Sequence, residues 1–335
     1  MYAQYFGLKK SPFSLSPDPH FLSLTPKHRE AFGGLLLAVT ARKGFLVLTG
    51  DAGTGKTTLV RKMLSSIPAT CAQFSVIVNP TLNASEFLET VLMDYGVSDI
   101  PESKALRLSL LRRLLLQAHG QGKTSVLVID EAHLLTSDLL EEIRLLSNFE
   151  TSEEKLLQII LAGQNELNTV LDQESRRHIK QRIAVRLDLA PLAAKDVLDY
   201  MQKRWTCAGG PGPIPFSDSA VALVARGSGG IPRVINAICD AVLTNVYGRG
   251  ASRIEAEDML EVLGEMHLIP PSTRDTQQIL DRETAPVTAE THPALIDSPP
   301  PFVFRSFQRY TPAASRGHKT FRWTQWFGLG SESRS

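Results

Sequence analysis

The chain has 335 residues, with a hydrophobic share of 43%, a charged share of 21% and a formal net charge of +1. This balance is ordinary for a soluble globular protein of one large domain or two modest ones, and bulk charge supports neither a nucleic-acid binder nor a trap for acidic ligands. The three cysteines, at positions 71, 207 and 239, form no CxxC pair, which excludes a disulfide scaffold and a cysteine-based zinc site.

The N-terminal sequence MYAQYFGLKK lacks the apolar core of a signal peptide. The longest apolar run, at about 31–41, is too short to span a bilayer. We therefore expect a cytoplasmic protein, and peripheral binding at the inner membrane stays open.

Residues 1–30 are expected to form an arm that packs on the main domain. Their closely spaced prolines exclude a long helix, and their aromatic residues favour an extended, docked segment. A helix is predicted from Thr25, its N-cap, to about Arg42, because Pro26 would take the first helical position and Glu30 the first turn.

Residues 31–190 alternate between short apolar runs and helical stretches. Strands are predicted at 44–50, 74–78, 125–130, 156–163 and 185–189, and helices at 55–66, 84–95, 104–118 and 137–148. Val-, Ile- and Leu-rich strands separated by helices indicate a parallel five-stranded sheet covered on both faces, an α/β core.

After Pro191 the strand pattern stops, and helices are predicted at about 193–206, 217–227, 231–247 and 255–264. We expect residues 191–268 to form a helical lid. Residues 269–335 are predicted to be a disordered linker followed by a tail in which basic and aromatic residues alternate. The tail fits docking on its own motor or a partner protein, binding to an anionic membrane surface, or stacking on single-stranded nucleic acid.

The segment GDAGTGKT at 50–57 matches G-x-x-x-x-G-K-[ST], the phosphate-binding P-loop, and lies between a predicted strand and a predicted helix. Glycines let the backbone N–H groups turn inward toward phosphate oxygens, and the following helix adds its positive end. Lys56 would reach the β- and γ-phosphates of ATP, and the Thr57 hydroxyl would bind Mg²⁺. The predicted nucleotide contacts are Gly50, Asp51, Ala52, Gly53, Thr54, Gly55, Lys56, Thr57 and Thr58.

The segment VLVIDEAH at 126–133 supplies the predicted acidic pair. Asp130, at the end of a buried strand that we place beside the P-loop strand, would be the Mg²⁺ carboxylate. Glu131 would polarise the attacking water, which favours hydrolysis over binding alone and argues against a slow nucleotide switch. The motif DEAH also occurs in helicases, but these need a second motor domain for which the chain has no room, so His133 is interpreted as a structural or coupling residue.

P-loop, acidic pair and helical lid in this order resemble the AAA+ ATPases. The stretches YFGLKKSPFSLSPDPHFL, RKGFLVLTGDAGTGKTTLV and LLSNFET resemble the branch that contains the general secretion pathway protein A ATPases, related exopolysaccharide-locus ATPases and, more distantly, transposon ATP-binding proteins. The resemblance covers about residues 1–268. The fuller secretion ATPases add a membrane span and a periplasmic wall-binding region, neither of which is visible here.

The resemblance implies further site residues. Gln164, with Asn165 as the alternative, matches the sensor 1 position, although a turn or cap residue would read the same. Arg233 in GGIPRVIN matches the sensor 2 arginine; as a cation in the first turn of a helix it is unfavourable for the helix dipole, which favours a functional role. Arg182 is the preferred arginine finger for a neighbouring subunit, and a solvated basic face is the other interpretation. The remaining finger candidates are Arg176, Arg177 and Arg186.

Together these features predict an ATPase that uses Mg²⁺, assembles as a homo-oligomer, and regulates or remodels an inner-membrane secretion or polysaccharide-export assembly. A DNA-associated ATPase of the transposition type is the alternative.

Overall fold

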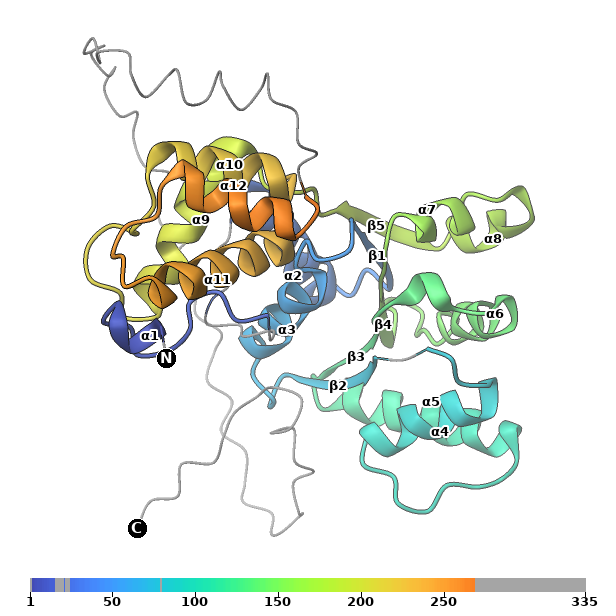
Figure 1. The fold of residues 1–335 in the computed structure, drawn as a ribbon. Helices are drawn as coiled ribbons and strands as arrows, with labels where there is room; N and C mark the ends of the chain where they lie inside the picture. Colours follow the sequence, from blue (N-terminus) through green and yellow to red (C-terminus); the bar gives the residue numbers. More distant parts are fainter. Residues whose placement is uncertain (1, 16–20, 22–24, 79, 269–335) are drawn as a thin grey trace, which may run out of the picture. The chain divides into compact units, whose positions relative to one another are not determined.

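The computed structural model describes residues 2–15, 21, 25–78 and 80–268. Five parallel strands form one sheet in the order β2-β3-β4-β1-β5 (Figure 1). The strands are β1 Phe45–Thr49, β2 Ala72–Ile77, β3 Thr124–Ile129, β4 Leu157–Ala162 and β5 Ile183–Asp188. The predicted α/β fold with a five-stranded parallel sheet is confirmed. Both edge strands begin earlier than predicted, β2 at Ala72 and β5 at Ile183.

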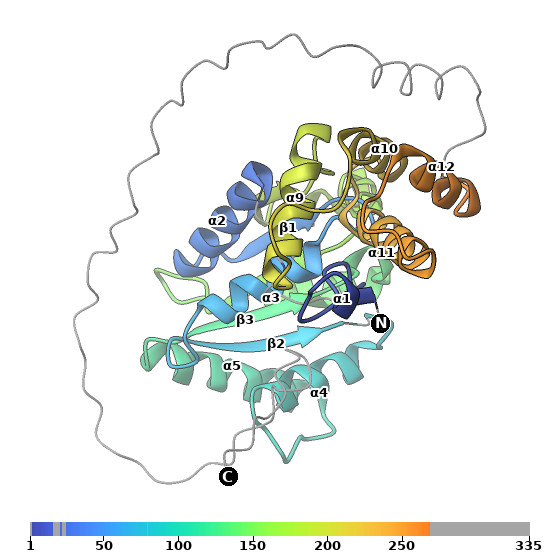
Figure 2. The same ribbon diagram turned by 60° about the vertical axis from the view of Figure 1, so that its left-hand side comes forward.

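Helices cover both faces of the sheet, as a parallel sheet requires. The helices α2 Pro26–Thr40 and α3 Lys56–Ser66 lie on one face (Figure 2). The other face is covered by α4 Ala84–Asp94, α5 Lys104–Gly120 and α6 Ser137–Leu146, whose buried residues form one cluster with strand residues. The Thr25 side chain accepts a hydrogen bond from His28 N, so the predicted cap of α2 is present.

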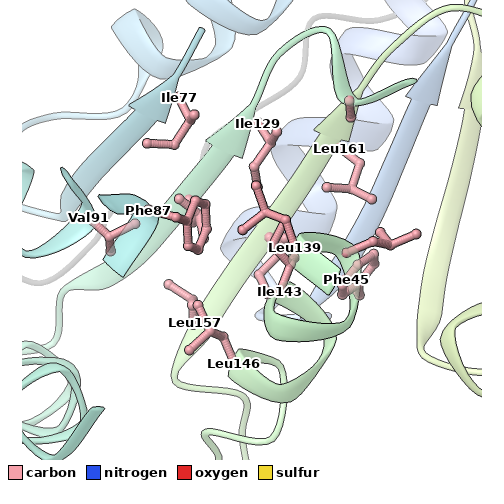
Figure 3. Close-up of a cluster of buried hydrophobic side chains, with 14 of the residues drawn as sticks. Phe45, Ile77, Phe87, Val91, Ile129, Leu139, Ile143, Leu146, Leu157 and Leu161 are labelled. Atoms are coloured by element: carbon pink, nitrogen blue, oxygen red, sulfur yellow. The ribbon is translucent and has the colours of Figure 1, made fainter. Parts of the chain in front are cut away.

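The main core lies between the sheet and α4, α5 and α6. Figure 3 shows Phe87 of α4 and Leu139 and Ile143 of α6 packed against strand residues such as Phe45 and Ile129. The strands β1 and β4 are buried along their whole length, whereas the edge strand β2 also contains half-buried residues. This core holds the ends of β1, β3 and β4 in fixed positions, and the site residues follow these ends.

The connection between β4 and β5 contains short helices that were not predicted. They are α7 Glu166–Leu171, the 3₁₀ turn η3 Glu174–Arg176 and α8 Arg177–Lys180; a further 3₁₀ turn, η2 Ala132–Leu134, follows β3. Each is six residues or shorter, which is too short to show a helical period in the sequence.

The C-terminal part of the described chain is all helical, as predicted. It consists of α9 Ala194–Cys207, α10 Asp218–Ser228, α11 Pro232–Gly248 and α12 Ala256–Glu265. Pro232 takes the first position of α11, where its missing N–H costs nothing. In the stretches that the structure describes, no helix combines the length and the apolarity needed to cross a bilayer. The predicted linker and tail, 269–335, lie outside these stretches.

The N-terminal arm docks on this helical lid. It begins with the one-turn helix α1 Tyr2–Tyr5, which contacts α11 (Figures 1 and 2). Phe6 packs edge-on against Trp205, and Phe13 packs edge-on against Phe216. The arm was expected to pack on the main domain, and both of these ring contacts are with the lid.

Candidate functional site

The glycine-rich loop joins β1 to α3. Gly50, Gly53 and Gly55 all have positive φ, and two of them also lack space for a side chain. A Cβ at Gly50 would lie 2.5 Å from the carbonyl oxygen of Leu189, and one at Gly53 would lie 2.7 Å from Cβ of Arg233. Such approaches are shorter than van der Waals contact, so the tight turn requires glycine. This backbone can bring its N–H groups toward an anion.

Lys56 begins α3 and turns its side chain back into the loop. The residue is 7% exposed, and Nζ donates to the carbonyl oxygens of Gly50 and Asp51, both at 2.8 Å. Burial lowers the pKa of the Lys56 ammonium, and nearby carboxylates act in the opposite direction. These are, from the largest effect to the smallest, Glu131, Asp130, Asp51 and Glu166. The cation is therefore held inside the loop, where a phosphate would sit.

Asp130 follows β3 and is 5% exposed. Thr57 Oγ1 donates to Asp130 Oδ2 at 2.7 Å, so the two predicted metal residues meet. The prediction that Asp130 lies beside the P-loop strand is wrong, because β4 lies between β1 and β3. Thr57 in the first turn of α3 spans this gap. A hydroxyl and a carboxylate are hard oxygen ligands of the kind that Mg²⁺ prefers, so this pair fits the predicted ion.

Glu131 has a left-handed backbone, with φ 51° and ψ 37°. This conformation is uncommon outside glycine and often marks functional positions. Its Oε2 lies 3.4 Å from His133 Nδ1, and His133 Nε2 lies 3.2 Å from the side-chain nitrogen of Gln164. One imidazole thus joins the acidic residue to the end of β4, which agrees with a coupling role for His133.

The residues predicted as sensors, Gln164 and Arg233, line the cavity beside the loop. Gln164 lines the same cavity as Glu131, whereas Asn165 Nδ2 donates to Asp51 Oδ1 at 2.7 Å on the exposed side of the loop. Arg233 lines the cavity from the first turn of α11, and its backbone N–H donates to the Gly53 carbonyl at 3.2 Å. These positions favour Gln164 over Asn165 for a contact inside the cavity.

The candidate arginine fingers lie apart from these residues. None of these four arginines, all of which the structure describes, lines the cavity that Glu131, Gln164 and Arg233 share. Arg176 Nη2 donates to Ser137 Oγ at 2.8 Å, and Arg186 Nη1 lies 3.3 Å from Asp172 Oδ1. Arg182 lies just before β5, where its charge lowers the pKa of Glu150 as a minor cause beside the hydrogen bond from Lys155.

The cavity has a volume of about 480 Å³ and extends from the loop to the arm and the lid. Its predicted lining residues are Ala52, Gly53, Thr54, Gly55, Lys56, Thr57, Thr58, Glu131, Gln164 and Arg233. The predicted contacts Gly50 and Asp51 do not line it and instead offer their carbonyls to Lys56.

The remaining lining residues were not predicted. They are Ser14, Leu15, Phe21, His28, Tyr200, Arg204, Pro232 and Asn236. Arg204 is 7% exposed; its Nε donates to the Pro12 carbonyl at 2.6 Å, and its guanidinium lies 4.7 Å from the Phe21 ring centroid. The Tyr200 hydroxyl donates to Asn236 Oδ1 at 2.9 Å. The clustered prolines and aromatics of the arm were a usable signal for this region, but no local pattern marks the lid residues.

Comparisons with known proteins agree with this geometry. A family model described as an AAA domain matches residues 39–171. General secretion pathway protein A of Aeromonas hydrophila is 41% identical over 260 residues, which is 77% of this chain. The chain spans about half of that protein's length, 47%.

Solved structures share the fold at low identity. The ORC2 protein of Aeropyrum pernix, in its ADPNP-ADP complexes, superposes with a TM-score of 0.59 at 14% identity over 77% of this chain and 72% of that one. Cdc6p of Pyrobaculum aerophilum superposes with a TM-score of 0.59 at 19% identity, over 80% of this chain and 73% of that one. At such identity the likeness shows the fold alone.

Proposed function

Because the chain belongs to the AAA+ ATPases of the general secretion pathway protein A type, we propose that it binds ATP with Mg²⁺ in this cavity and hydrolyses it. The observation that supports this proposal best is that Lys56, Thr57 and Glu131 line one cavity, and that Thr57 is hydrogen-bonded to Asp130. A cation, two hard oxygen ligands and a carboxylate are the groups that phosphoryl transfer to water requires.

The residues divide the work along the cavity. The loop and Lys56 hold the phosphates. Thr57 and Asp130 would hold Mg²⁺, and the ion would supply positive charge beside the phosphate oxygens. Glu131 accepts a proton from the water that attacks the γ-phosphorus, the bond from that phosphorus to the bridging oxygen breaks, and ADP leaves. Gln164 and Arg233 contact the phosphate end. The adenine ring of ATP lies in the partly apolar region that Phe21, Tyr200 and Asn236 line.

We propose that the chain forms a homo-oligomer that regulates or remodels a secretion or export assembly at the cytoplasmic face of the inner membrane. The support is the 41% identity with general secretion pathway protein A over 260 residues. The DNA-associated alternative predicts a different response to nucleic acid, which separates the two.

ATP turnover is expected to be the same with and without added DNA, because the proposed client is a protein assembly. Steady-state hydrolysis is measured with the full chain alone, with single-stranded DNA and with double-stranded DNA, at two salt concentrations. Strong stimulation that disappears at high salt would favour the transposition-type ATPase, since phosphate contacts are salt-dependent. Equal rates in all three samples support the proposed role.

Arg182→Ala is expected to lower turnover by about 10³-fold if Arg182 completes a neighbour's site, the typical effect of an arginine finger. Mixing it with Lys56→Ala should restore part of the activity, since a site with an intact Lys56 can then receive Arg182 from its neighbour. Wild-type activity per subunit should also rise with protein concentration.

Two comparisons make the mixing experiment specific. Lys56→Ala mixed with Glu131→Gln should give no rescue, because both changes damage the same side of the site. If mixing with Lys56→Ala does not restore the activity of Arg182→Ala, the same experiment identifies the finger among Arg176→Ala, Arg177→Ala and Arg186→Ala. Activity that is flat with concentration, with no rescue by any pair, would contradict shared sites.

A further inference from the structure

His28 of α2 bridges the N-terminus of its own helix and the phosphate loop. The side chain is buried, with the residue 3% exposed. Its Nε2 lies 3.2 Å from the carbonyl oxygen of Thr54, and its Nδ1 lies 2.7 Å from Thr25 Oγ1. Helices α2 and α3 lie side by side, so this contact joins the neighbouring helix to the loop that starts α3 (Figure 1).

The hydrogen-bond partners determine where the ring carries its proton. A carbonyl oxygen only accepts, so Nε2–H donates to Thr54, and Nδ1 accepts from the Thr25 hydroxyl. Burial lowers the pKa of His28, while the hydrogen bond to Thr54 acts in the opposite direction. The ring is therefore neutral near pH 7, and its single N–H is directed at the loop.

This bond fixes the direction of the carbonyl in the Thr54–Gly55 peptide. The Thr54 carbonyl and the Gly55 N–H belong to the same planar trans peptide, so they point in opposite directions. Gly55 has φ of 101°, and glycine adopts positive and negative φ about equally well. A carbonyl held toward α2 thus directs the Gly55 N–H away from α2.

We propose that His28 is a positioning residue that presets the Thr54–Gly55 peptide so that the loop N–H groups face the terminal phosphates. This inference rests on the proposed nucleotide binding. Since the loop is arranged before the ligand arrives, less ordering is required on binding, and affinity rises for ligands that reach the loop. A ligand without a β-phosphate gains little from this arrangement.

The test compares ADP and AMP binding to the full chain. His28→Phe keeps a buried ring and removes the donor, so ADP affinity should fall about tenfold or more while AMP affinity changes little. His28→Gln keeps a donor and should lose less ADP affinity than His28→Phe. Thr25→Val removes the hydroxyl that donates to His28 Nδ1, so ADP affinity should fall as it does in His28→Phe. Thr25→Ser keeps the hydroxyl and should bind ADP like wild type. Affinities are measured by calorimetry, with AMP also measured by competition.

Stability is controlled separately. Asn83→Ala removes the cap of α4, where Asn83 Oδ1 accepts from Ser85 N at 2.9 Å, and Asn83 does not line the cavity. It should lower the unfolding temperature without changing ADP affinity. A His28→Phe protein that binds ADP like wild type, or that loses ADP and AMP by the same factor, overturns the proposal. Wild-type protein that binds no ADP would instead contradict the proposed function.

Discussion

Glu131→Gln is expected to bind ATP like wild type and to hydrolyse it about 10²- to 10⁴-fold more slowly, the range typical of losing a general base. The amide has almost the shape of the carboxylate but cannot take a proton from water. We expect the left-handed backbone at position 131 and the contact with His133 to be retained in this variant. Nucleotide affinity and single-turnover hydrolysis are measured on the same preparation.

Glu166→Gln is the matched control for Glu131→Gln. Glu166 lies close enough to raise the pKa of Lys56, so its replacement removes a negative charge from the same region without removing the proposed base. Its turnover should stay near that of wild type. If both variants slow hydrolysis equally, the effect of Glu131 is one of charge; if Glu131→Gln hydrolyses ATP at the wild-type rate, another group activates the water.

Lys56→Ala is expected to abolish nucleotide binding, because it removes the cation that the loop encloses. The variant also removes the Lys56 hydrogen bonds to the carbonyls of Gly50 and Asp51, of which the Asp51 carbonyl still accepts from Thr54, so the loop itself should lose order. Lys62→Ala is the control, since Lys62 is an exposed lysine on the same helix. Calorimetry with ADP and with ATP measures the difference between the two.

Retained binding by Lys56→Ala would show that the phosphates lie elsewhere in the cavity. Equal loss in Lys62→Ala would point to general damage of α3. The thermal unfolding temperature of each variant distinguishes these outcomes from misfolding, because a folded loop variant retains the cooperative transition of the sheet and lid.

The parts of the site that could be predicted are those encoded by neighbouring residues. The P-loop, the Asp130–Glu131 pair and the helix starts at Thr25 and Pro232 each depend on a few consecutive positions. Local chemistry of this kind is readable because the physical partners are adjacent in the chain. The same holds for the alternation of strands and helices.

The parts that could not be predicted depend on which elements become neighbours. No residue pattern within β3 or β4 indicates that β4 lies next to β1. The sequence therefore predicts Asp130 one strand too close to the P-loop strand. Arg204 reads as an ordinary charge on a helix, yet it is buried against carbonyls of the arm. His28 reads as a polar residue of a first turn, and its partner Thr54 is 26 positions away.

The docking of the arm on the lid has a consequence for the order in which the chain acquires its structure. Arg204 and the Pro12 carbonyl are separated by 192 positions, and the Tyr5 hydroxyl donates to the Gly250 carbonyl across 245 positions. During synthesis the arm leaves the ribosome before the core and the lid, so Phe13 can pack against Phe216 only after all five strands have been made. The sheet, whose strands lie between these ends, can close earlier at a lower loop-closure cost. The arm is thus made before the surface that buries it, and a chain that stops within the lid leaves the aromatic side chains of its arm exposed to self-association.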